Sequence, residues 1–306
     1  MIVGQDRIIE GLLTALLAGG HCLLEGLPGL AKTLTMETLS VVVAGTFHRI
    51  QFTPDLVPSD IVGTRIYRPG SGDFGVELGP VFANFVLADE INRAPAKVQS
   101  ALLEVMSEGQ VTIGGTTHRV PTPFMVLGTQ NQIESEGVFV LPEAQQDRFL
   151  FKLRVGYPTA TEEVEIIQRM SQRPPTPERV LSPQAVLQLQ QLVRDVYLDR
   201  AVVDYIVAIV AATRQPEAHG LEDLSGWIAH GVSPRASLGL AAAGRARAVL
   251  HGRRYVKPRD VHAVAADVLR HRMVLSYEAL ARRVDADEIV TAVLQAVPAP
   301  TVVARA

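Results

Sequence analysis

The sequence predicts a layered α/β domain, with helices on both sides of a five-stranded and mainly parallel sheet, followed by an all-α domain. Three observations lead to this fold class. Short apolar runs alternate with helical stretches up to about residue 157, only helical spacing follows, and a proline-rich connector lies at 173–177. We therefore expect a first domain over residues 1–157 and a second over 158–306, in keeping with roughly 150 residues per domain.

The composition supports a folded protein and narrows the class. Hydrophobic residues make up 47% of the chain and charged residues 20%, which is enough apolar material for a core. The chain has 29 Lys and Arg and 32 Asp and Glu, so its net charge does not indicate a nucleic-acid or membrane surface. The single cysteine, Cys22, allows no intrachain disulfide. The longest apolar run, Ile206–Ala212, is too short to span a bilayer, and the N-terminus lacks a secretory signal. We expect a cytoplasmic protein without membrane insertion.

Five runs have the length and composition of buried strands, because each is a short apolar segment that ends at a turn or polar signal. They are His21–Glu25, Phe47–Phe52, Asn84–Ala88, Phe124–Thr129 and Phe149–Val155. Strands that alternate with helices favour a parallel sheet that is covered on both faces.

Helical spacing is clearest from Pro95 to Glu108, where apolar residues recur at intervals of three and four and Gly109 provides the stop. After the connector, the same spacing predicts four helices. They are Ser182–Leu198, Arg200–Arg214, Pro234–His251 and Pro258–Arg272.

Two insertions interrupt the first domain, near 62–80 and 110–121. The first is rich in glycine and proline and is too long for a simple connection. The second places Gly114-Gly115 between two short strand-like arms, which indicates a hairpin. Long ordered insertions are usually functional or mobile.

The strongest chemical signal is GLPGLAKT, from Gly26 to Thr33, after the first strand and before a helix expected to end near Ala44. Such a loop presents backbone N–H groups to phosphate oxygens, and the helix dipole favours the anion. Lys32 would neutralise the β- and γ-phosphates, and the Thr33 hydroxyl would ligate Mg²⁺. Ala31 stands where a second glycine is usual. The alternative is a tight turn that happens to end in Lys-Thr.

A second signal is the pair of carboxylates, Asp89 and Glu90, directly after the third strand. Asp89 would hold Mg²⁺ through its water shell, and Glu90 would orient and polarise the attacking water. Alone, the pair could be an acidic cap of a strand. Together with the phosphate-binding loop, it favours ATP hydrolysis over mere storage of a nucleotide.

Three further residues fit a phosphate-centred site. Asn131, after the fourth strand, would hold the attacking water, unless it only shapes a turn. Arg148 could reach a neighbouring subunit as an arginine finger or form a surface salt bridge with Asp147 or Glu143. Arg235 opens a helix of the second domain and could couple that domain to the γ-phosphate.

These stretches together resemble the MoxR family of AAA+ ATPases over nearly the whole chain. The motifs that carry the resemblance are GQ near the start, GLPGLAKT, LADEINRAPAKVQSALLEVM, GTQNQIESEG, LPEAQQDRF and GVSPRAS. The resemblance implies that Glu90, Asn131, Arg148 and Lys32 are catalytic, with Asn131 as first sensor, and that Thr33 and Asp89 hold Mg²⁺. It implies that Gly4 and Gln5 lie beside the adenine and that Arg235 is the second sensor. The residues expected to contact the nucleotide are Val3, Gly4, Gln5, Gly26, Pro28, Gly29, Leu30, Ala31, Lys32, Thr33, Leu34, Asp89, Glu90, Asn131 and Arg235.

The resemblance also implies an architecture and partners. The fold would be a P-loop AAA+ core with a helical lid, and the two insertions would be a helix-two insert and a pre-sensor hairpin. ATP or ADP with Mg²⁺ would be bound. A homo-oligomer, expected to be a hexameric ring, would act as a chaperone on a client enzyme that needs a metal or cofactor, with a partner that carries a von Willebrand factor A domain.

Two features leave alternatives open. Arg93 would either contact nucleotide across a subunit interface or pack locally. The stretch Arg245–Arg259 carries only positive charges, and we favour a solvated or inter-subunit face over nucleic-acid binding, because aromatic residues are nearly absent from it. A nucleic-acid motor and a slow nucleotide-gated switch therefore remain the rival functions.

Overall fold

The structure is a computed structural model that describes residues 2–26, 30, 32–70, 72–130, 139, 141–171 and 176–301. The chain divides into two compact units. The first contains Met1–Phe149 and Leu153–Gln188, and the second contains Leu150–Lys152 and Leu189–Ala306. No helix in the described ranges is both long and apolar enough to cross a membrane.

The first unit is built on a five-stranded sheet with the strand order β2-β5-β8-β1-β9. The strands are β1 (Cys22–Gly26), β2 (Phe47–Gln51), β5 (Phe85–Asp89), β8 (Met125–Gln130) and β9 (Phe151–Val155). The pairs β2–β5, β5–β8 and β8–β1 are parallel. The predicted five-stranded, mainly parallel sheet is confirmed.

Both faces of this sheet are covered. In β8, Val126 belongs to a core cluster that also contains Leu102 of α4 (Ala96–Glu108). The next residue, Leu127, points to the opposite face and is fully buried as well. A central strand buried on both sides is the arrangement expected of a parallel sheet with helices on each face.

The predicted helix that begins at Pro95 has clear end signals in the structure. In α4, Pro95 occupies the N-cap position, and Gly109 (φ +62°) returns its N–H to the Val105 carbonyl, so this predicted helix is confirmed. The other helical segments are α1 (Asp6–Ala18), α2 (Lys32–Val42), α3 (Pro58–Val62), η1 (Ile91–Arg93), α5 (Glu143–Gln146) and α6 (Ala160–Met170). Helix α7 (Pro183–Arg194) begins in this unit and ends in the second.

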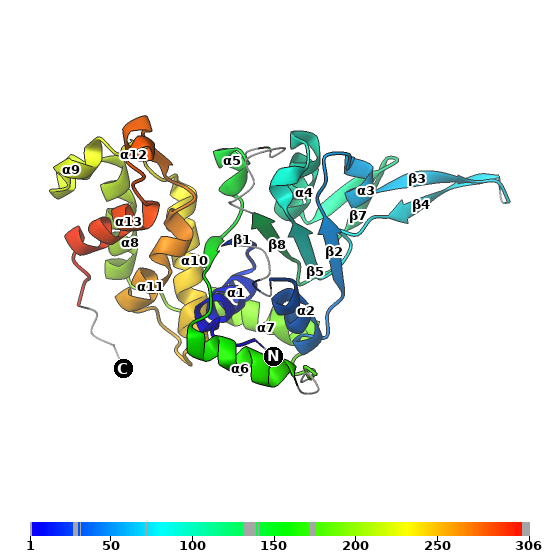
Figure 1. Ribbon diagram of the computed structural model, residues 1–306, viewed down its shortest axis with the longest axis horizontal. Coiled ribbons are helices and arrows are strands. Elements are labelled where there is room, and N and C mark those ends of the chain that lie inside the picture. Colours follow the sequence, from blue (N-terminus) through cyan, green and yellow to red (C-terminus); the bar gives the residue numbers. More distant parts are fainter. Residues whose placement is uncertain are drawn as a thin grey trace. The chain divides into compact units, whose positions relative to one another are not determined.

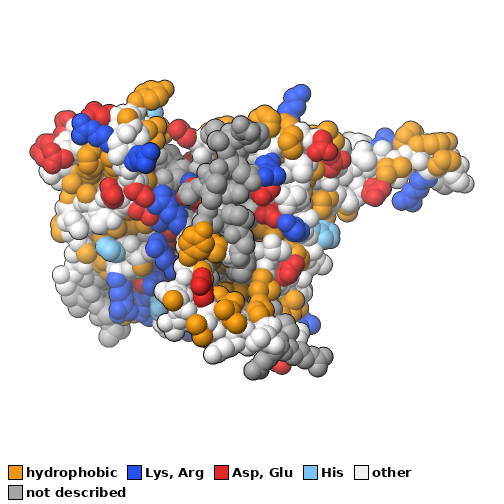
Figure 2. All heavy atoms as spheres, viewed as in Figure 1, with side chains coloured by type: hydrophobic (Ala, Val, Ile, Leu, Met, Phe, Trp, Pro, Cys, Tyr) orange, Lys and Arg blue, Asp and Glu red, His pale blue; other side chains and the backbone are white. Residues whose placement is uncertain are grey.

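Each insertion forms an antiparallel hairpin. The second is β6 (Gln110–Ile113) with β7 (Thr116–Arg119), and the first is β3 (Gly63–Arg68) with β4 (Asp73–Leu78). The β3–β4 ribbon projects away from the sheet (Figure 1). Apolar side chains gather toward its outer end (Figure 2), where Ile66, Tyr67 and Phe74 are exposed. Leu78 is exposed at its base, where it pairs with Gly63.

The β3–β4 ribbon leaves and rejoins the domain through a narrow neck. A Cβ atom on Gly63 (φ +98°) would collide with the Glu77 carbonyl, and one on Gly79 would collide with the Ile61 carbonyl. The Val81 N–H also donates to the Ile61 oxygen, at 3.2 Å. The two backbones can approach this closely only because both positions are glycine.

The second unit is mainly helical. It contains α8 (Arg200–Arg214), η2 (Pro216–His219), α9 (Glu222–Ser225), α10 (Pro234–Leu250), α11 (Pro258–Leu269), α12 (Tyr277–Ala281) and α13 (Ala286–Ala296). A small antiparallel pair, β10 (Ile228–His230) with β11 (Val274–Leu275), lies among them. Strands of three and two residues carry too little periodicity to be predicted, so the expectation of helices alone needs this correction.

The boundary between the units differs from the one drawn at residue 157. The backbone N–H groups of Val180 and Leu181 both donate to the Val42 carbonyl at the end of α2, each at 2.9 Å. These bonds connect residues 176–181 to the first unit. The boundary between the two compact units therefore lies within α7, after the predicted position at residue 157. That helix ends at Arg194, before the predicted Leu198, because Tyr197 pairs with the segment around Tyr255.

One buried histidine joins three elements of the first unit. His21 precedes β1, and its Nδ1 accepts the Val126 N–H at 3.0 Å while its Nε2 lies 3.1 Å from the Met106 carbonyl. This pattern requires the proton on Nε2. Burial lowers the pKa of His21 to about 4, although the contact with Met106 acts in the opposite direction. A proton on Nδ1 would face the Val126 N–H and break the contact.

His21 should make stability depend on pH. Its pKa is about 4 in the folded state and about 6.5 when unfolded, so the unfolded chain binds more protons between these values. Stability is therefore complete above pH 6.5, falls as the pH drops toward 4, and changes by roughly 3 kcal/mol in all. We expect His21→Gln, which cannot titrate, to lose less stability than wild type between pH 7 and 4.5. Parallel denaturant curves of the two proteins would contradict this assignment.

Candidate functional site

The carboxyl ends of four adjacent strands meet at one edge of the sheet. The register places Gln51 of β2 beside Asp89 of β5, and Glu25 of β1 beside Gln130 of β8. Gly26 then begins the glycine-rich loop. Ligands of open parallel sheets bind beyond this edge, so the strand order itself brings the predicted loop and the predicted carboxylates together.

Lys32 lies within electrostatic range of both carboxylates. It is the first residue of α2, and its Nζ donates to the Gly26 carbonyl at 2.6 Å. Burial lowers the pKa of Lys32, while the charges of Asp89, Glu90 and Glu25 act to raise it. The predicted cation and the two predicted acids therefore share one partly desolvated site.

Asp89 is held by two neighbouring strands. Its Oδ1 accepts the Thr129 hydroxyl of β8 at 2.6 Å, and its Oδ2 accepts the Arg49 Nη2 of β2 at 2.6 Å. The carboxylate is only 17% exposed. Two charge-assisted contacts from opposite sides fix its orientation.

Glu90 follows in a left-handed backbone conformation (φ +56°, ψ +49°). A residue with a Cβ adopts this region at a cost of about 1–3 kcal/mol, and such residues cluster at functional sites. The Glu90 N–H donates to the Thr129 hydroxyl at 2.8 Å, which holds the turn. Its carboxylate Oε2 accepts Gln51 Nε2 at 2.7 Å and lies 3.2 Å from Arg93 Nε.

Sequence reasoning missed three residues of this cluster. Thr129, Arg49 and Gln51 lie at or near strand ends, but only the strand order makes them neighbours of Asp89 and Glu90. Thr129 could have been predicted from its position, because it places a hydroxyl at the end of the strand that neighbours the strand ending in Asp89. Arg93, for which two roles stayed open, contacts Glu90 of its own chain in this structure.

The predicted adenine contacts lie at the N-terminus of the first unit. Gly4 (φ +70°) lies so close to the Glu162 carboxylate of α6 that a Cβ would collide with it. Gln5 Nε2 donates to the Gly156 carbonyl at 3.4 Å. Val3 precedes this turn. The segment after β9 therefore fixes the position of the N-terminal turn.

The remaining predicted residues are distributed as follows. Thr33 and Leu34 lie in the first turn of α2, just after Leu30. Arg148 follows α5 and donates from Nη1 to the Leu103 carbonyl at 2.7 Å. Arg235 lies exposed in the first turn of α10 of the second unit, after the N-cap Ser233. Pro28, Gly29, Ala31 and Asn131 lie outside the described residues.

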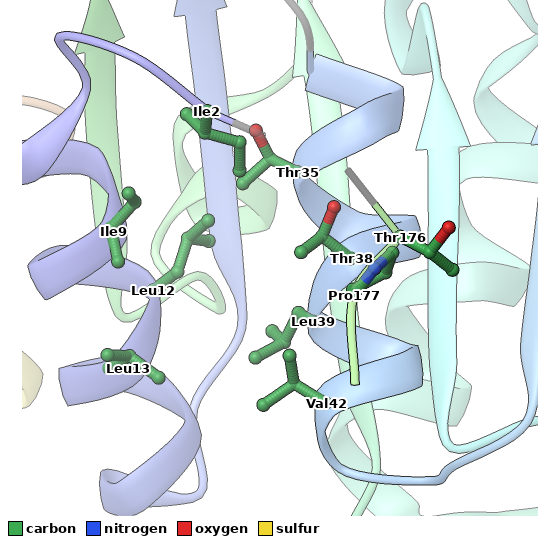
Figure 3. A pocket seen from close by; sticks show the side chains of 10 residues that line it. All are labelled: Ile2, Ile9, Leu12, Leu13, Thr35, Thr38, Leu39, Val42, Thr176 and Pro177. Atoms are coloured by element: carbon green, nitrogen blue, oxygen red, sulfur yellow. The ribbon is translucent and has the colours of Figure 1, made fainter. Parts of the chain in front are cut away.

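A cavity of about 450 Å³ lies between α1 and α2 (Figure 3). Its walls are mainly apolar, and it is lined by Ile2, Ile9, Leu12, Leu13, Thr35, Thr38, Leu39, Val42, Thr176 and Pro177. The Oγ1 atom of Thr38 is buried without a hydrogen-bond partner among the described residues. An apolar cavity with a few polar groups is the usual character of a small-molecule site.

The basic stretch is partly used inside the second unit. Arg253 forms a two-point salt bridge with the buried Asp260, at 2.5 and 2.6 Å, and Arg247 lies 3.9 Å from the same carboxylate. Charges engaged in this way contribute less to a surface for nucleic acid.

Comparison with known proteins agrees with this geometry. The family model "ATPase family associated with various cellular activities (AAA)" matches residues 21–151, and an AAA lid domain matches residues 225–293. A candidate ATPase from Cytophaga hutchinsonii, known from a crystal structure, is 46% identical and superposes with a TM-score of 0.92, covering 98% of this chain and 92% of its own.

Relatives match over almost the whole chain. The chaperone MoxR1 of Mycobacterium tuberculosis is 58% identical, over 99% of this chain and 80% of its own length. The protein MoxR of Methylorubrum extorquens is 31% identical, over 98% of this chain and 92% of its own length. The predicted family and the fold of an AAA+ core with a lid are confirmed. This chain belongs to the MoxR family of AAA+ ATPases.

Proposed function

We propose that this protein hydrolyses Mg-ATP and works as a chaperone in a ring of identical subunits, expected to be a hexamer. The cluster at one sheet edge carries the proposal: Thr129 joins Asp89 to Glu90, and Lys32 lies within electrostatic range of both acids. Membership in an ATPase family supports nucleotide binding. A lysine and two carboxylates at one sheet edge are groups of the kind that ATP hydrolysis uses.

The residues present fit a magnesium ion. Mg²⁺ prefers hard oxygen ligands and keeps several waters, and the Thr33 hydroxyl and the Asp89 carboxylate provide such oxygens. When bound with nucleotide, the ion would neutralise phosphate charge. Thr129 and Arg49 hold the Asp89 carboxylate in place for this task.

Glu90 is the proposed general base. Its carboxylate would take a proton from the attacking water, while Lys32 would neutralise charge on the phosphate oxygens. Gln51 and Arg93 contact the same Glu90 oxygen and so fix where the base lies. Asn131 would hold the water, and Arg235 would report the nucleotide state to the lid.

The cavity between α1 and α2 is the proposed place of the adenine. Its apolar walls suit the faces of a purine, and the unpartnered Thr38 hydroxyl could bond to the ring edge. Ile2, one residue from Val3 and two from Gly4, lines the same cavity.

The proposed partners rest on membership in the MoxR family, of which one relative is a chaperone by name. We propose a client enzyme that needs a metal or cofactor, together with a protein that carries a von Willebrand factor A domain. The exposed apolar ribbon β3–β4 and the hairpin β6–β7 offer contact surfaces on the first unit. Salt-sensitive DNA binding with DNA-stimulated hydrolysis would instead support the motor function.

Glu90→Gln should separate binding from hydrolysis. The variant keeps an oxygen to accept from Gln51 but lacks a base, so we expect unchanged ATP affinity and a turnover reduced by about 10²–10⁴-fold. Calorimetry and phosphate release measure the two quantities. Glu104→Gln, an exposed acid on α4, is the matched control. Wild-type hydrolysis by the Glu90 variant would remove Glu90 from the mechanism.

Thr129→Val should disturb both carboxylates at once. The isosteric change removes the donor to Asp89 and leaves the Glu90 N–H without its acceptor, at a cost of about 1–3 kcal/mol. We expect a lower melting temperature and a lower turnover number. Thr117→Val, an exposed hydroxyl of β7 paired with Thr112, should change neither. Equal behaviour of the two variants would show that the Thr129 bridge is dispensable.

The specific rate of ATP hydrolysis should rise with protein concentration, because Arg148 is proposed to complete the site of a neighbouring subunit. Arg148→Ala should lose this activity by about 10³-fold or more and still bind ATP. Arg200→Ala, which removes an exposed arginine of α8, is the control. A constant rate in a dilute sample shown by sizing to be monomeric would argue against a shared site.

A further inference from the structure

Two arginines at the end of α11 hold the backbone of a three-residue segment, Leu150–Lys152. Arg272 Nη1 donates to the Leu150 carbonyl at 3.0 Å, and Arg270 Nη1 donates to the Lys152 carbonyl. The segment lies before and at the start of β9, and these contacts explain why it belongs to the second unit although its neighbours belong to the first.

The anchor of this contact is rigid. The Arg270 side chain is 2% exposed and bonds to the Asp267 carboxylate at 2.5 Å. It also bonds to both oxygens of Asp287, in the first turn of α13, at 2.7 and 3.1 Å. A buried guanidinium with two carboxylates has little freedom to leave, since an unpaired buried charge is strongly unfavourable.

Further contacts fix the segment in the helical unit. Arg272 Nη1 also donates to the Val268 carbonyl at 2.5 Å, which anchors this arginine to the last turn of α11. Leu150 lies beside α10, where a Cβ on Gly239 would come within 3.4 Å of its Cδ1 atom. The segment Leu150–Lys152 is therefore bound to the helical unit through Arg270, Arg272 and α10.

The residues directly before this segment belong to the first unit. Phe149 is fully buried in the core cluster of the sheet domain. Arg148, the proposed arginine finger, donates to the Leu103 carbonyl of α4. Phe149 is therefore the one residue in the chain between Arg148 and Leu150, whose carbonyl accepts a hydrogen bond from Arg272.

We propose that Arg270 and Arg272 are positioning residues for Arg148. By holding Leu150 and Lys152, they tie the helical unit to the finger that the same chain offers to the next subunit. The inference rests on the proposed role of Arg148 in a neighbouring site. A local change of the helical unit is then transmitted along the backbone to the finger, and it affects hydrolysis in the neighbour rather than in its own nucleotide site.

Mixed assemblies test this directly. Chains with Arg148→Ala keep a complete nucleotide site but lack the finger, and chains with Glu90→Gln lack the base but supply the finger. An equimolar mixture should recover hydrolysis that neither variant shows alone. Arg272→Ala is then added either to the finger-supplying chain or to the site-supplying chain, with Arg282→Ala, an exposed arginine of α12's end, as the matched control.

We expect Arg272→Ala to lower the recovered rate about tenfold or more only on the finger-supplying chain, since small misplacements of a catalytic group have effects of this size. An equal loss on both chains, or no loss on either, would overturn the proposal. A mixture of the two parent variants that recovers nothing would instead refute the shared site, and the inference with it.

A second variant, Arg272→Lys, keeps the test decisive if Arg272→Ala fails to fold. Arg272→Lys keeps the charge but offers no planar fork to two carbonyls. If Arg272→Ala lowers the melting temperature strongly, the same two mixtures are measured with Arg272→Lys. A loss confined to the finger-supplying chain supports the proposal, and a loss shared by both chains overturns it.

Discussion

The pairing of β5 with β8 is the constraint on which the site depends. Its parallel register sets Ala88 beside Gly128, and the next residues, Asp89 and Thr129, then meet at the sheet edge. One hydroxyl donates to the Asp89 carboxylate and accepts the backbone N–H of Glu90. The two acids therefore hold different orientations although they are consecutive in the chain.

Much of the fold could be predicted, because it depends on local pattern. The five strands were found within one or two residues, and Arg200–Arg214 matches α8 at both ends. Helix α6 was missed although its capping box, Thr159 with Glu162, is visible in the sequence. Its apolar residues Val164, Ile167 and Met170 also recur at intervals of three, although all three are exposed, so the helix was predictable from the sequence. The strands β10 and β11 are too short to carry a pattern.

The candidate site was predictable only in part, for a topological reason. Lys32, Asp89 and Glu90 stand in motifs whose spacing is informative within the chain. Arg49, Gln51 and Thr129 act across strands whose sequence order differs from their spatial order, β2-β5-β8-β1-β9. No spacing rule along the chain reports such a contact. His21 is similar, because its two partners follow it by more than eighty residues.

The glycine neck of the β3–β4 ribbon bears on how this domain can diversify. The backbone leaves at Gly63 and returns at Gly79 through one close crossing, and beyond it the Arg65 side chain of β3 lies against Gly114 of the β6–β7 hairpin. The outer part of the ribbon, whose apolar residues Ile66, Tyr67 and Phe74 are exposed, does not carry the packing demands that govern the core. The outer part of the ribbon can therefore change in length and sequence between related proteins. Such changes would give the domain a new contact surface and leave the proposed nucleotide site unchanged.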